Sequence, residues 1–371
     1  MFSWEKVIEV RKMVNFCTLF DSYYLDKGLA LYRSLERASR NFHLFLFCFD
    51  EKSRQVLTEY ALPHATILSH KDIEAEEEKL PALKKERSKA EYCWTCTPVI
   101  IEYVLKHFPV ESCTYIDADL YFFSDPGVLF DEIKEAGADV VITEHRFSQS
   151  LKDRRLLKRS GKYCVEFNYF CQSENSRRVL TWWKEKCFEW CYHIYEAERM
   201  GDQKYLEQFP KLFDGIHELQ HLGGGVAPWN LGQYRLAEES DVKADSLQKN
   251  AVQNSLDIRL VTKKNGTEFP LVFYHFQNIR YLGNDKVNIN SCIHDRALKE
   301  AIYLPYLAEL EKVRSELKKK GITFEVKKSY ASNKWIAFAQ RNILQYKIRS
   351  LSDLIELTRV RGESKCFETY E

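Results

Sequence analysis

Apolar residues in the first 50 positions form runs whose spacing alternates between strand and helix patterns. Residues 13–20 are almost continuously apolar, which is typical of a strand buried on both faces. Residues 25–38 carry Leu31 and Leu35 four positions apart and predict a helix, and residues 42–49 form a second buried strand. This strand–helix–strand opening predicts an α/β fold, with a doubly wound, mostly parallel sheet flanked by helices.

Charged and capping residues divide the next hundred positions. Residues 71–89 are very highly charged and predict a solvated helix or a mobile flap. Thr97 followed by Pro98 predicts a helix start, because threonine caps helices and proline is favoured at the first helical position. A strand ending in two acids follows, then a short helix from residue 124 and a further strand at 138–143.

The second half of the chain mixes helices and loops. Residues 179–196 predict an aromatic helix, which is more typical of core packing than of a carbohydrate platform. Residues 201–206 open another helix, and the glycines within 222–230 allow backbone to approach a ligand closely. Residues 269–276 predict an apolar strand, and the chain is expected to be helical from residue 302 onward.

Length and composition exclude several classes of protein. The 371 residues can form one large α/β domain or two modest ones, and 45% hydrophobic with 14% aromatic content indicates a globular protein. The 55 basic and 54 acidic residues nearly cancel, so no overall field selects nucleic acid. No apolar stretch approaches 18 residues, so we expect no membrane span.

Eleven scattered cysteines, without a signal-peptide pattern, predict free thiols in the reducing cytoplasm. Cys93 with Cys96, and Cys187 with Cys191, have spacings that invite a zinc interpretation. Both pairs lie in tryptophan-rich, apparently helical segments without turn glycines, unlike a zinc knuckle or ribbon. We therefore interpret them as core thiols.

The main chemical signal is Asp117-Ala118-Asp119, where an apolar strand meets a loop. In an extended segment, residues i and i+2 share a face, so both carboxylates can reach one hard cation. Mg²⁺ or Mn²⁺ held in this way completes its shell with phosphate oxygens and water. Acidic pairs are also common in turns and caps, but a pair inside so apolar a stretch is costly unless something compensates it.

The predicted position of the acids supports the same interpretation. They follow about the third strand, at the carboxyl edge of the sheet, where open α/β sheets bind ligands. The chain has neither of the glycine-rich phosphate motifs G-x-G-x-x-G and G-x-x-x-x-G-K-[ST]. A nucleotide would therefore be held through metal and side chains.

These residues together resemble the GT-A glycosyltransferases, and the wording around the acids is similar to family 8 and related bacterial sugar transferases. The resemblance covers about residues 13–282 and departs from family 8 after the late histidine, where Arg280 stands nearby as a candidate phosphate contact. Its segments, in chain order, are 16–21, Arg87-Ser88-Lys89, Tyr115-Ile116-Asp117-Ala118-Asp119, Asp202-Gln203 and Tyr274-His275-Phe276.

The resemblance implies a GT-A domain over residues 1–300 and a helical, basic extension over 301–371. It also implies a hexosyltransferase that moves a sugar from a nucleotide-diphosphate sugar, UDP rather than GDP, to a glycan or lipid-linked acceptor. The expected cofactor is Mn²⁺ or Mg²⁺, with Asp117, Asp119 and His275 as ligands. The other assignments are Asp202 and Gln203 as catalytic residues, and as donor-binding residues Thr18, Asp21, Tyr23, Arg87, Lys89, Asp117, Ala118 and Arg280.

Each of these residues also has a purely structural interpretation. His275 can be a satisfied core histidine, Arg87 and Lys89 a charged helix face, and Thr18, Asp21 and Tyr23 the packing of a strand end. Asp202 can cap a helix after Gly201. If the reaction retains configuration, Asp202 and Gln203 orient the sugar and stabilise its positive character. If it inverts, Asp202 is the candidate base; retention is favoured.

Residues 327–350 are basic and aromatic without any acid, so they predict either a helix on an anionic membrane surface or a helix packed on the domain. Two alternative functions stay open. A sugar-phosphate nucleotidyltransferase would use a similar sheet and acidic ligands, but normally has a glycine-rich loop near its first strand. A non-catalytic protein that binds nucleotide-sugar would retain the fold without turnover.

Overall fold

A single mixed sheet organises the computed structural model, which describes residues 13–238, 257–282, 286–289, 295–324 and 354–356. The sheet has seven strands in the order β3-β2-β1-β4-β7-β6-β8. β7 is antiparallel to β4 and β6, and every other neighbouring pair is parallel. The strands are β1 (Val14–Phe20), β2 (Phe42–Cys48), β3 (Ala65–Ser69), β4 (Ser112–Ile116), β6 (Val140–Glu144), β7 (Tyr163–Cys171) and β8 (Ile216–Glu218).

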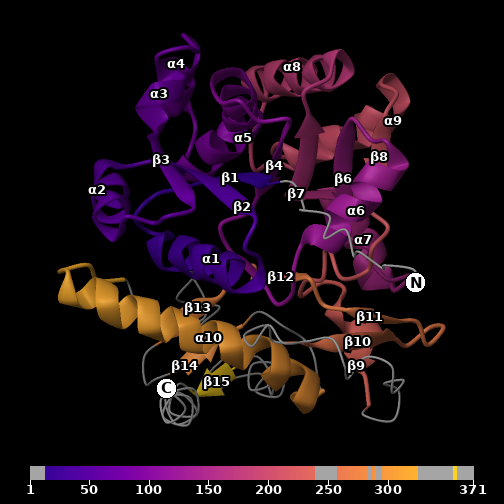
Figure 1. Ribbon diagram of the computed structural model, residues 1–371. Helices are drawn as coiled ribbons and strands as arrows, with labels where there is room; N and C mark the ends of the chain where they lie inside the picture. The colour runs from indigo at the N-terminus through magenta and orange to yellow at the C-terminus, as the bar shows by residue number, and fades with distance from the viewer. Residues whose placement is uncertain (1–12, 239–256, 283–285, 290–294, 325–353, 357–371) are drawn as a thin grey trace, which may run out of the picture.

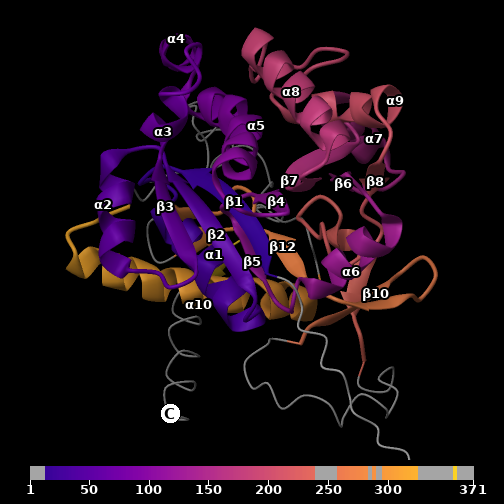
Figure 2. The same cartoon turned by 45° about the horizontal axis from the view of Figure 1, so that its top comes forward.

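Helices cover the sheet and link its strands, which confirms the predicted α/β class (Figures 1 and 2). The C-terminal helix α10 lies along α1, where Arg33 forms ion pairs with Glu309 and Glu316. The helices are α1 (Leu25–Ala38), α2 (Glu51–Tyr60), α3 (His70–Glu74), α4 (Leu80–Glu86), α5 (Lys89–His107), α6 (Gly127–Ala136), α7 (Leu151–Ser160), α8 (Glu174–Glu189), α9 (Phe209–Leu212) and α10 (Arg296–Lys319), with short 3-10 helices η1 (Gln203–Gln208) and η2 (Leu231–Gln233).

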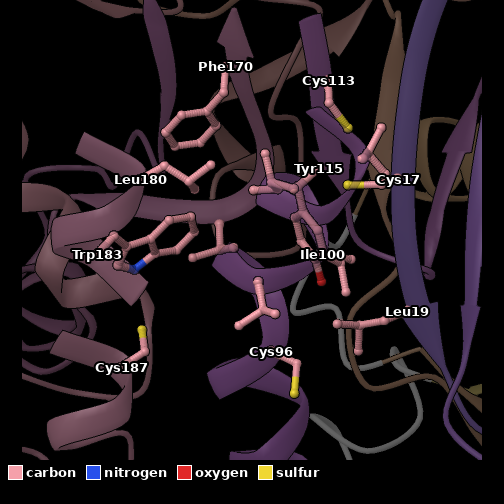
Figure 3. Close-up of a cluster of buried hydrophobic side chains, with 14 of the residues drawn as sticks. Cys17, Leu19, Cys96, Ile100, Cys113, Tyr115, Phe170, Leu180, Trp183 and Cys187 are labelled. Carbon is pink, nitrogen blue, oxygen red and sulfur yellow. The ribbon is translucent and has the colours of Figure 1, made fainter. Parts of the chain in front are cut away.

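The side chains of β1 alternate between two apolar layers, one on each face of the sheet. Cys17 and Leu19 join a cluster with α5 and α8, in which Trp183 stacks on Phe170 with ring centroids 6.1 Å apart (Figure 3). Phe16 and Phe20 face the other way, into a cluster with α1, α2 and the C-terminal part of α10. Burial on both faces explains why the β1 sequence is apolar throughout.

Three small strand groups lie outside the main sheet in the described residues. β5 pairs with β12 in an antiparallel ribbon, while β9, β10 and β11 form one three-stranded sheet and β13, β14 and β15 another. A third apolar cluster, rich in tyrosine and phenylalanine, joins the β5–β12 ribbon to α10. These strands are β5 (Leu120–Phe122), β9 (Tyr234–Leu236), β10 (Arg259–Thr262), β11 (Glu268–Pro270), β12 (Phe273–His275), β13 (Arg280–Leu282), β14 (Lys286–Asn288) and β15 (Leu354–Glu356).

The predicted helix start at Thr97 and Pro98 is wrong. Helix α5 begins at Lys89 and contains Pro98 in its interior. Ser88 and Glu91 form a reciprocal capping box at its N-terminus, which satisfies two backbone donors. This cap and burial of the apolar face of α5 outweigh the backbone hydrogen bond that proline removes.

Several other expected boundaries also change. The charged segment 71–89 contains most of α3, all of α4 and the first residue of α5. The single strand expected at 269–276 is divided into β11 and β12, and the acids follow β4, the fourth strand. Segment 201–206 opens a 3-10 helix, and α8 spans Glu174–Glu189 instead of 179–196.

The paired cysteines are free thiols. Cys96, Cys187 and Cys191 are fully buried and Cys93 partly so. Among the described residues, none of these four belongs to a group close enough to hold one metal ion. The basic segment 327–350 lies outside the described residues, and the domain division at residue 300 stays a prediction. None of the helices described is long and apolar enough to cross a bilayer.

Replacing Gly28 by alanine tests the close packing of α1 on the end of β1. A Cβ atom at Gly28 would overlap the buried ring of Phe20. Helix propensity alone predicts that Gly28→Ala stabilises by about 1 kcal/mol. Because the overlap forces Phe20 to move, we instead expect a loss of about 1–3 kcal/mol in the free energy of unfolding, measured by denaturant titration. Gly232→Ala is the control, because that position is open, and its effect should stay within about 0.5 kcal/mol. A stabilised Gly28→Ala variant would contradict this packing.

Candidate metal and nucleotide site

The two acids lie where the strand order of the sheet reverses. β1 has β2 on one side and β4 on the other, so the carboxyl ends of β1 and β4 form the switch point at which open α/β sheets bind ligands. Asp117 follows β4 directly, and Asp119 precedes β5. The backbone turns between them, since the amide of Leu120 donates to the carbonyl of Asp117 at 3.1 Å.

A short antiparallel ribbon brings His275 to these acids from more than 150 positions away. β12 pairs with β5 so that His275 lies opposite Leu120. The amide of Phe276 donates to the carbonyl of Asp119 at 2.9 Å, and the amide of His275 donates to that of Val226 at 3.0 Å. The imidazole is therefore held by backbone pairing on both sides.

Asp117, Asp119 and His275 form a compact potential ligand set. Nε2 of His275 lies 3.1 Å from Oδ1 of Asp119 and 3.7 Å from Oδ2 of Asp117. One ligand atom from each residue lies within 4.8 Å of the others. Two carboxylates and an imidazole are a donor set suited to Mn²⁺ and Mg²⁺. The Asp117 side chain is 29% exposed, which leaves one side open to a substrate.

Electrostatics in the metal-free site indicate how strongly it favours positive charge. Burial raises the pKa of Asp117 to about 6, against the attraction of His275, and the neighbouring Asp119 charge adds to the rise. Burial alone would also raise the pKa of Asp119, but His275 lowers it overall. Burial disfavours a charged His275, yet Asp119 raises its pKa well above the usual value. A proton on His275 thus balances the acids, and a bound cation would take its place.

Glu166 in β7 orients the histidine from behind. Its Oε2 lies 2.7 Å from Nδ1 of His275, which leaves Nε2 directed to the acids. Such a carboxylate behind a ligand histidine fixes the ring and raises its basicity. Cys164, Glu166 and His275 form a second group close enough for an ion. All three are buried, and burial raises the pKa of Cys164 to about 12, so the first set fits a substrate-accessible metal better.

The glycine-rich segment supports this arrangement from the other side. Gly225 has φ of +88°, and a Cβ there would lie 2.8 Å from Cγ2 of Thr143 and 3.3 Å from Oε1 of Glu166. The Arg146 guanidinium holds the segment in place, because it donates to the carbonyls of residues 219, 221, 222 and 224. The sequence predicted that these glycines let the backbone approach a ligand; Gly225 also leaves space for the side chain of Glu166.

Asp202 is buried near the acids, at the start of η1. It is 5% exposed, and its side chain makes no capping bond to that helix, so the cap interpretation is not supported. Burial raises its pKa to about 7, against a hydrogen bond from Thr97, and the charge of Asp117 adds to the rise. Its carbonyl accepts from Nε1 of Trp183 at 2.9 Å, which ties it to α8. An acid with a pKa near neutrality is suited to acid–base chemistry.

The three predicted phosphate contacts have different environments. Arg87, directly after α4, is buried and donates to the carbonyls of Cys187 and Phe188 at 2.7 and 2.8 Å, so it joins the end of α4 to α8. Binding phosphate would require it to leave these carbonyls. The Lys89 side chain is 94% exposed, with Nζ 3.9 Å from Oδ2 of Asp21, and Arg280 is exposed. Both of these cations are accessible from solvent, and Lys89 has a long ion pair with Asp21.

The residues predicted to contact the nucleobase and sugar are divided between surface and interior. Asp21 is partly buried and accepts from the amide of Tyr23, whose side chain is 54% exposed. Thr18 is fully buried and its hydroxyl has no partner within the described chain. Ala118 is buried between the acids, and Nε2 of Gln203 donates to the carbonyl of Ser160 at 2.5 Å. These ligand contacts stay predictions.

Sequence reasoning missed three neighbours of the ligand set besides Glu166: Lys27, Tyr24 and Trp229. Lys27 is buried in α1 close enough for Asp119 to raise its pKa, although burial lowers it overall, and its Nζ lies 3.4 Å from the ring centroid of Tyr24. No carboxylate of the described residues lies within 4.0 Å of Lys27 Nζ. Trp229 packs edge-on against His275 at 5.3 Å. A buried acid in the apolar β7 sequence was a readable signal for Glu166; nothing in the sequence distinguished Lys27.

Comparisons with known proteins give distant similarities. No family model matches the chain. YfnF of Bacillus subtilis strain 168, an uncharacterised protein, is 29% identical over 301 residues, which cover 80% of this chain and 89% of its own. YfnD of the same strain, also uncharacterised, is 27% identical over 310 residues, which cover 82% of this chain and 90% of YfnD.

Three similar solved structures are glycosyltransferases. Galactosyltransferase LgtC, in complex with donor and acceptor sugar analogs, has a TM-score of 0.47 at 11% identity and covers 81% of this chain and 96% of its own. Mouse xyloside xylosyltransferase 1 has a TM-score of 0.41 at 14% sequence identity, and the similarity covers 71% of this chain and 98% of the mouse protein's chain. Glycosyltransferase GlyE of Streptococcus pneumoniae TIGR4 has a TM-score of 0.41 at 13% sequence identity, and the similarity covers 86% of this chain and 66% of the GlyE chain. These similarities are too distant to assign an activity, which depends on the chemistry of the site.

Replacing Glu166 by glutamine tests whether this residue supports a metal ligand. The change keeps the side-chain size but removes the charge behind His275, so we expect affinity for Mn²⁺ to fall about 10- to 100-fold. Calorimetric titration of Mn²⁺ into both proteins measures the change. Glu185→Gln, at an exposed position of α8, is the control and should bind as the wild type does. Equal affinities in Glu166→Gln and wild type would contradict the assignment.

Proposed function

We propose that this protein is a metal-dependent glycosyltransferase of the GT-A type, which transfers a sugar from a UDP-sugar to a glycan or lipid-linked acceptor. The observation that supports this most is the ligand set of Asp117, Asp119 and His275 at the switch point of a doubly wound sheet. A substrate-accessible cation at that position suits a nucleotide diphosphate, whose oxygens complete the metal shell.

The proposed roles follow from the charges of the site. Asp117, Asp119 and Nε2 of His275 would hold Mn²⁺ or Mg²⁺, with Glu166 fixing the imidazole. The bound ion would supply Lewis-acid neutralisation of the departing diphosphate. Besides the predicted Lys89 and Arg280, the buried Lys27 offers a cation near Asp119. Its side chain would contact a phosphate oxygen, because an ammonium buried without an ion-pair partner favours an anion.

Asp202 is the residue we propose beside the anomeric carbon, with Gln203 next to it. Because Asp202 is only 5% exposed, it is better placed to face a buried donor sugar than to deprotonate an acceptor arriving from solvent. We therefore propose retention of configuration, in which Asp202 orients the sugar and stabilises positive charge on it. The configuration of the product, measured by NMR, tests this assignment.

The two alternative functions are less well supported. A sugar-phosphate nucleotidyltransferase normally holds phosphate in a glycine-rich loop, but here four residues without glycine, Asp21–Tyr24, join β1 to α1. A non-catalytic binding protein would have no need of Asp202, whose pKa of about 7 suits chemistry more than binding. Binding of UDP-sugar without hydrolysis or transfer to any acceptor would favour that alternative.

Replacing Asp119 by asparagine tests the metal–diphosphate site. We expect wild-type protein to bind UDP more tightly than GDP, and only with Mn²⁺ present. Asp119→Asn removes one ligand and the negative charge that attracts the ion, so UDP affinity should fall at least about 100-fold. Calorimetric titration of both nucleotides, with and without Mn²⁺, measures these differences.

Asp214→Asn is the matched control, because Asp214 is exposed and far from the ligand set in sequence. It should bind UDP as the wild type does. Metal-independent binding, or binding that survives Asp119→Asn, would contradict the proposed site. Failure to bind either nucleotide would overturn the proposed donor class.

Replacing Asp202 by asparagine tests its protonation and its role together. Its pKa is 3.8 when unfolded and about 7 when folded, so its protonated form stabilises the fold at low pH and this contribution is lost as pH rises through that window. Asp202→Asn should therefore flatten the decline in unfolding free energy across the window. Turnover should fall about 100-fold or more. Wild-type turnover in the variant would contradict a role in catalysis, and an unchanged pH profile of stability would contradict the raised pKa.

A further inference from the structure

Helix α7, which links β6 to β7, presents an unusual surface. Its only acid, Asp153, is buried; the Asp153 carboxylate accepts from the amide of Ser148, and the Asp153 amide donates to Oγ of Ser150. Five of the ten residues of the helix are basic. None of the carboxylates in the described part of the chain lies within 4.0 Å of these cations. They are Lys152, Arg154, Arg155, Lys158 and Arg159, and all five are exposed.

Exposed leucines accompany this charge. Leu151 is 75% exposed, the largest value among the large apolar side chains described, and Leu157 is 42% exposed. At 3.6 residues per turn, Leu151 projects opposite the inward-facing Asp153, between Arg155 and Lys158. A solvated helix face has no need of a leucine there, whereas a helix lying on a lipid surface combines apolar and basic side chains in this way.

The helix is held firmly despite its exposed face. The buried Lys204 donates to the carbonyls of Lys158 and Glu196 at 2.9 and 2.8 Å, and Gln203 donates to that of Ser160. The adjoining loop adds two more exposed apolar residues, Ile194 and Tyr195, at 54% and 42%. Arg159 lies 4.1 Å from the ring centroid of Tyr195, so the loop adjoins the C-terminal end of α7.

We propose that α7 and the adjoining residues 194–195 form a docking surface for an anionic phospholipid membrane. Anionic headgroups would neutralise the unpaired cations, and Leu151 would enter the boundary between headgroups and acyl chains. Gln203, next to Asp202, contacts the end of α7, so docking would bring the candidate site close to the lipid surface. The inference concerns binding alone and does not depend on the proposed transfer reaction.

Co-sedimentation of the full chain with vesicles tests this proposal. We expect binding to vesicles of phosphatidylglycerol and phosphatidylcholine in equal amounts, no binding to phosphatidylcholine alone, and weaker binding as salt increases. Each basic residue near such a surface raises affinity about fivefold, so Arg155→Gln/Lys158→Gln should reduce the partition coefficient about 25-fold. Leu151→Ser should reduce it about tenfold.

The matched control is Lys52→Gln/Arg178→Gln, which makes the same change in net charge at exposed positions of α2 and α8. Unchanged binding by this control supports a local surface. The proposal is overturned if the wild type does not bind, if the α7 variant binds normally, or if the control loses as much. It is also overturned if Leu151→Ser binds normally while soluble polyphosphate displaces the protein, since that pattern indicates a site for a polyanion. Circular dichroism verifies that each variant is folded.

Discussion

The burial of negative charge at the end of β4 is the constraint on which the rest of the structure depends. Asp117, Asp119 and Glu166 lie within one small, largely dry volume, where isolated carboxylates are strongly disfavoured. His275 lies between them, with Nε2 toward Asp117 and Asp119 and Nδ1 toward Glu166. Its pKa is raised well above the usual value, because the acids stabilise the protonated imidazole. In the metal-free protein a proton on His275 offsets the negative charge of the acids, and a divalent cation would offset more of it. The buried acids therefore favour a positive charge at this position.

Much of the surrounding fold serves to hold His275 in that position. The β5–β12 pairing places its backbone, Glu166 sets the ring, and Gly225 leaves the space that Glu166 needs. Arg146 fixes the glycine segment through backbone carbonyls, which is a more rigid attachment than packing alone would give. These contacts join β5, Arg146, β7, the glycine segment and β12, which are separate stretches of the chain. A change in any one of them is expected to reach the ligand set through the imidazole.

The arrangement also separates two kinds of surface. Lys27 and Asp202 are buried close enough to the ligand set for Asp119 and Asp117 to shift their pKa values, whereas Lys89 is exposed beside Asp21. The exposed cations lie on α7, whose last residue, Ser160, accepts from Gln203, and none of them has a carboxylate partner among the described residues. Unpaired basic charge on a fixed helix costs little in water, but it gives the protein a preferred direction toward an anionic partner.

Local pattern was enough to determine the alternation of strands and helices, the apolar character of β1, and the acids at the edge of the sheet. The predicted ligand role of His275 came from the resemblance to GT-A glycosyltransferases, because a lone histidine in an apolar strand is more typical of a core residue. Local pattern failed at Pro98, because the capping box that begins at Ser88 and the burial of α5 outweighed the proline. Only the tertiary structure decided that Arg87 is occupied by carbonyls, that Glu166 supports His275 and that Lys27 lies near Asp119. Those outcomes depend on contacts between distant segments, and one residue's sequence neighbours carry no information about its partner across the fold.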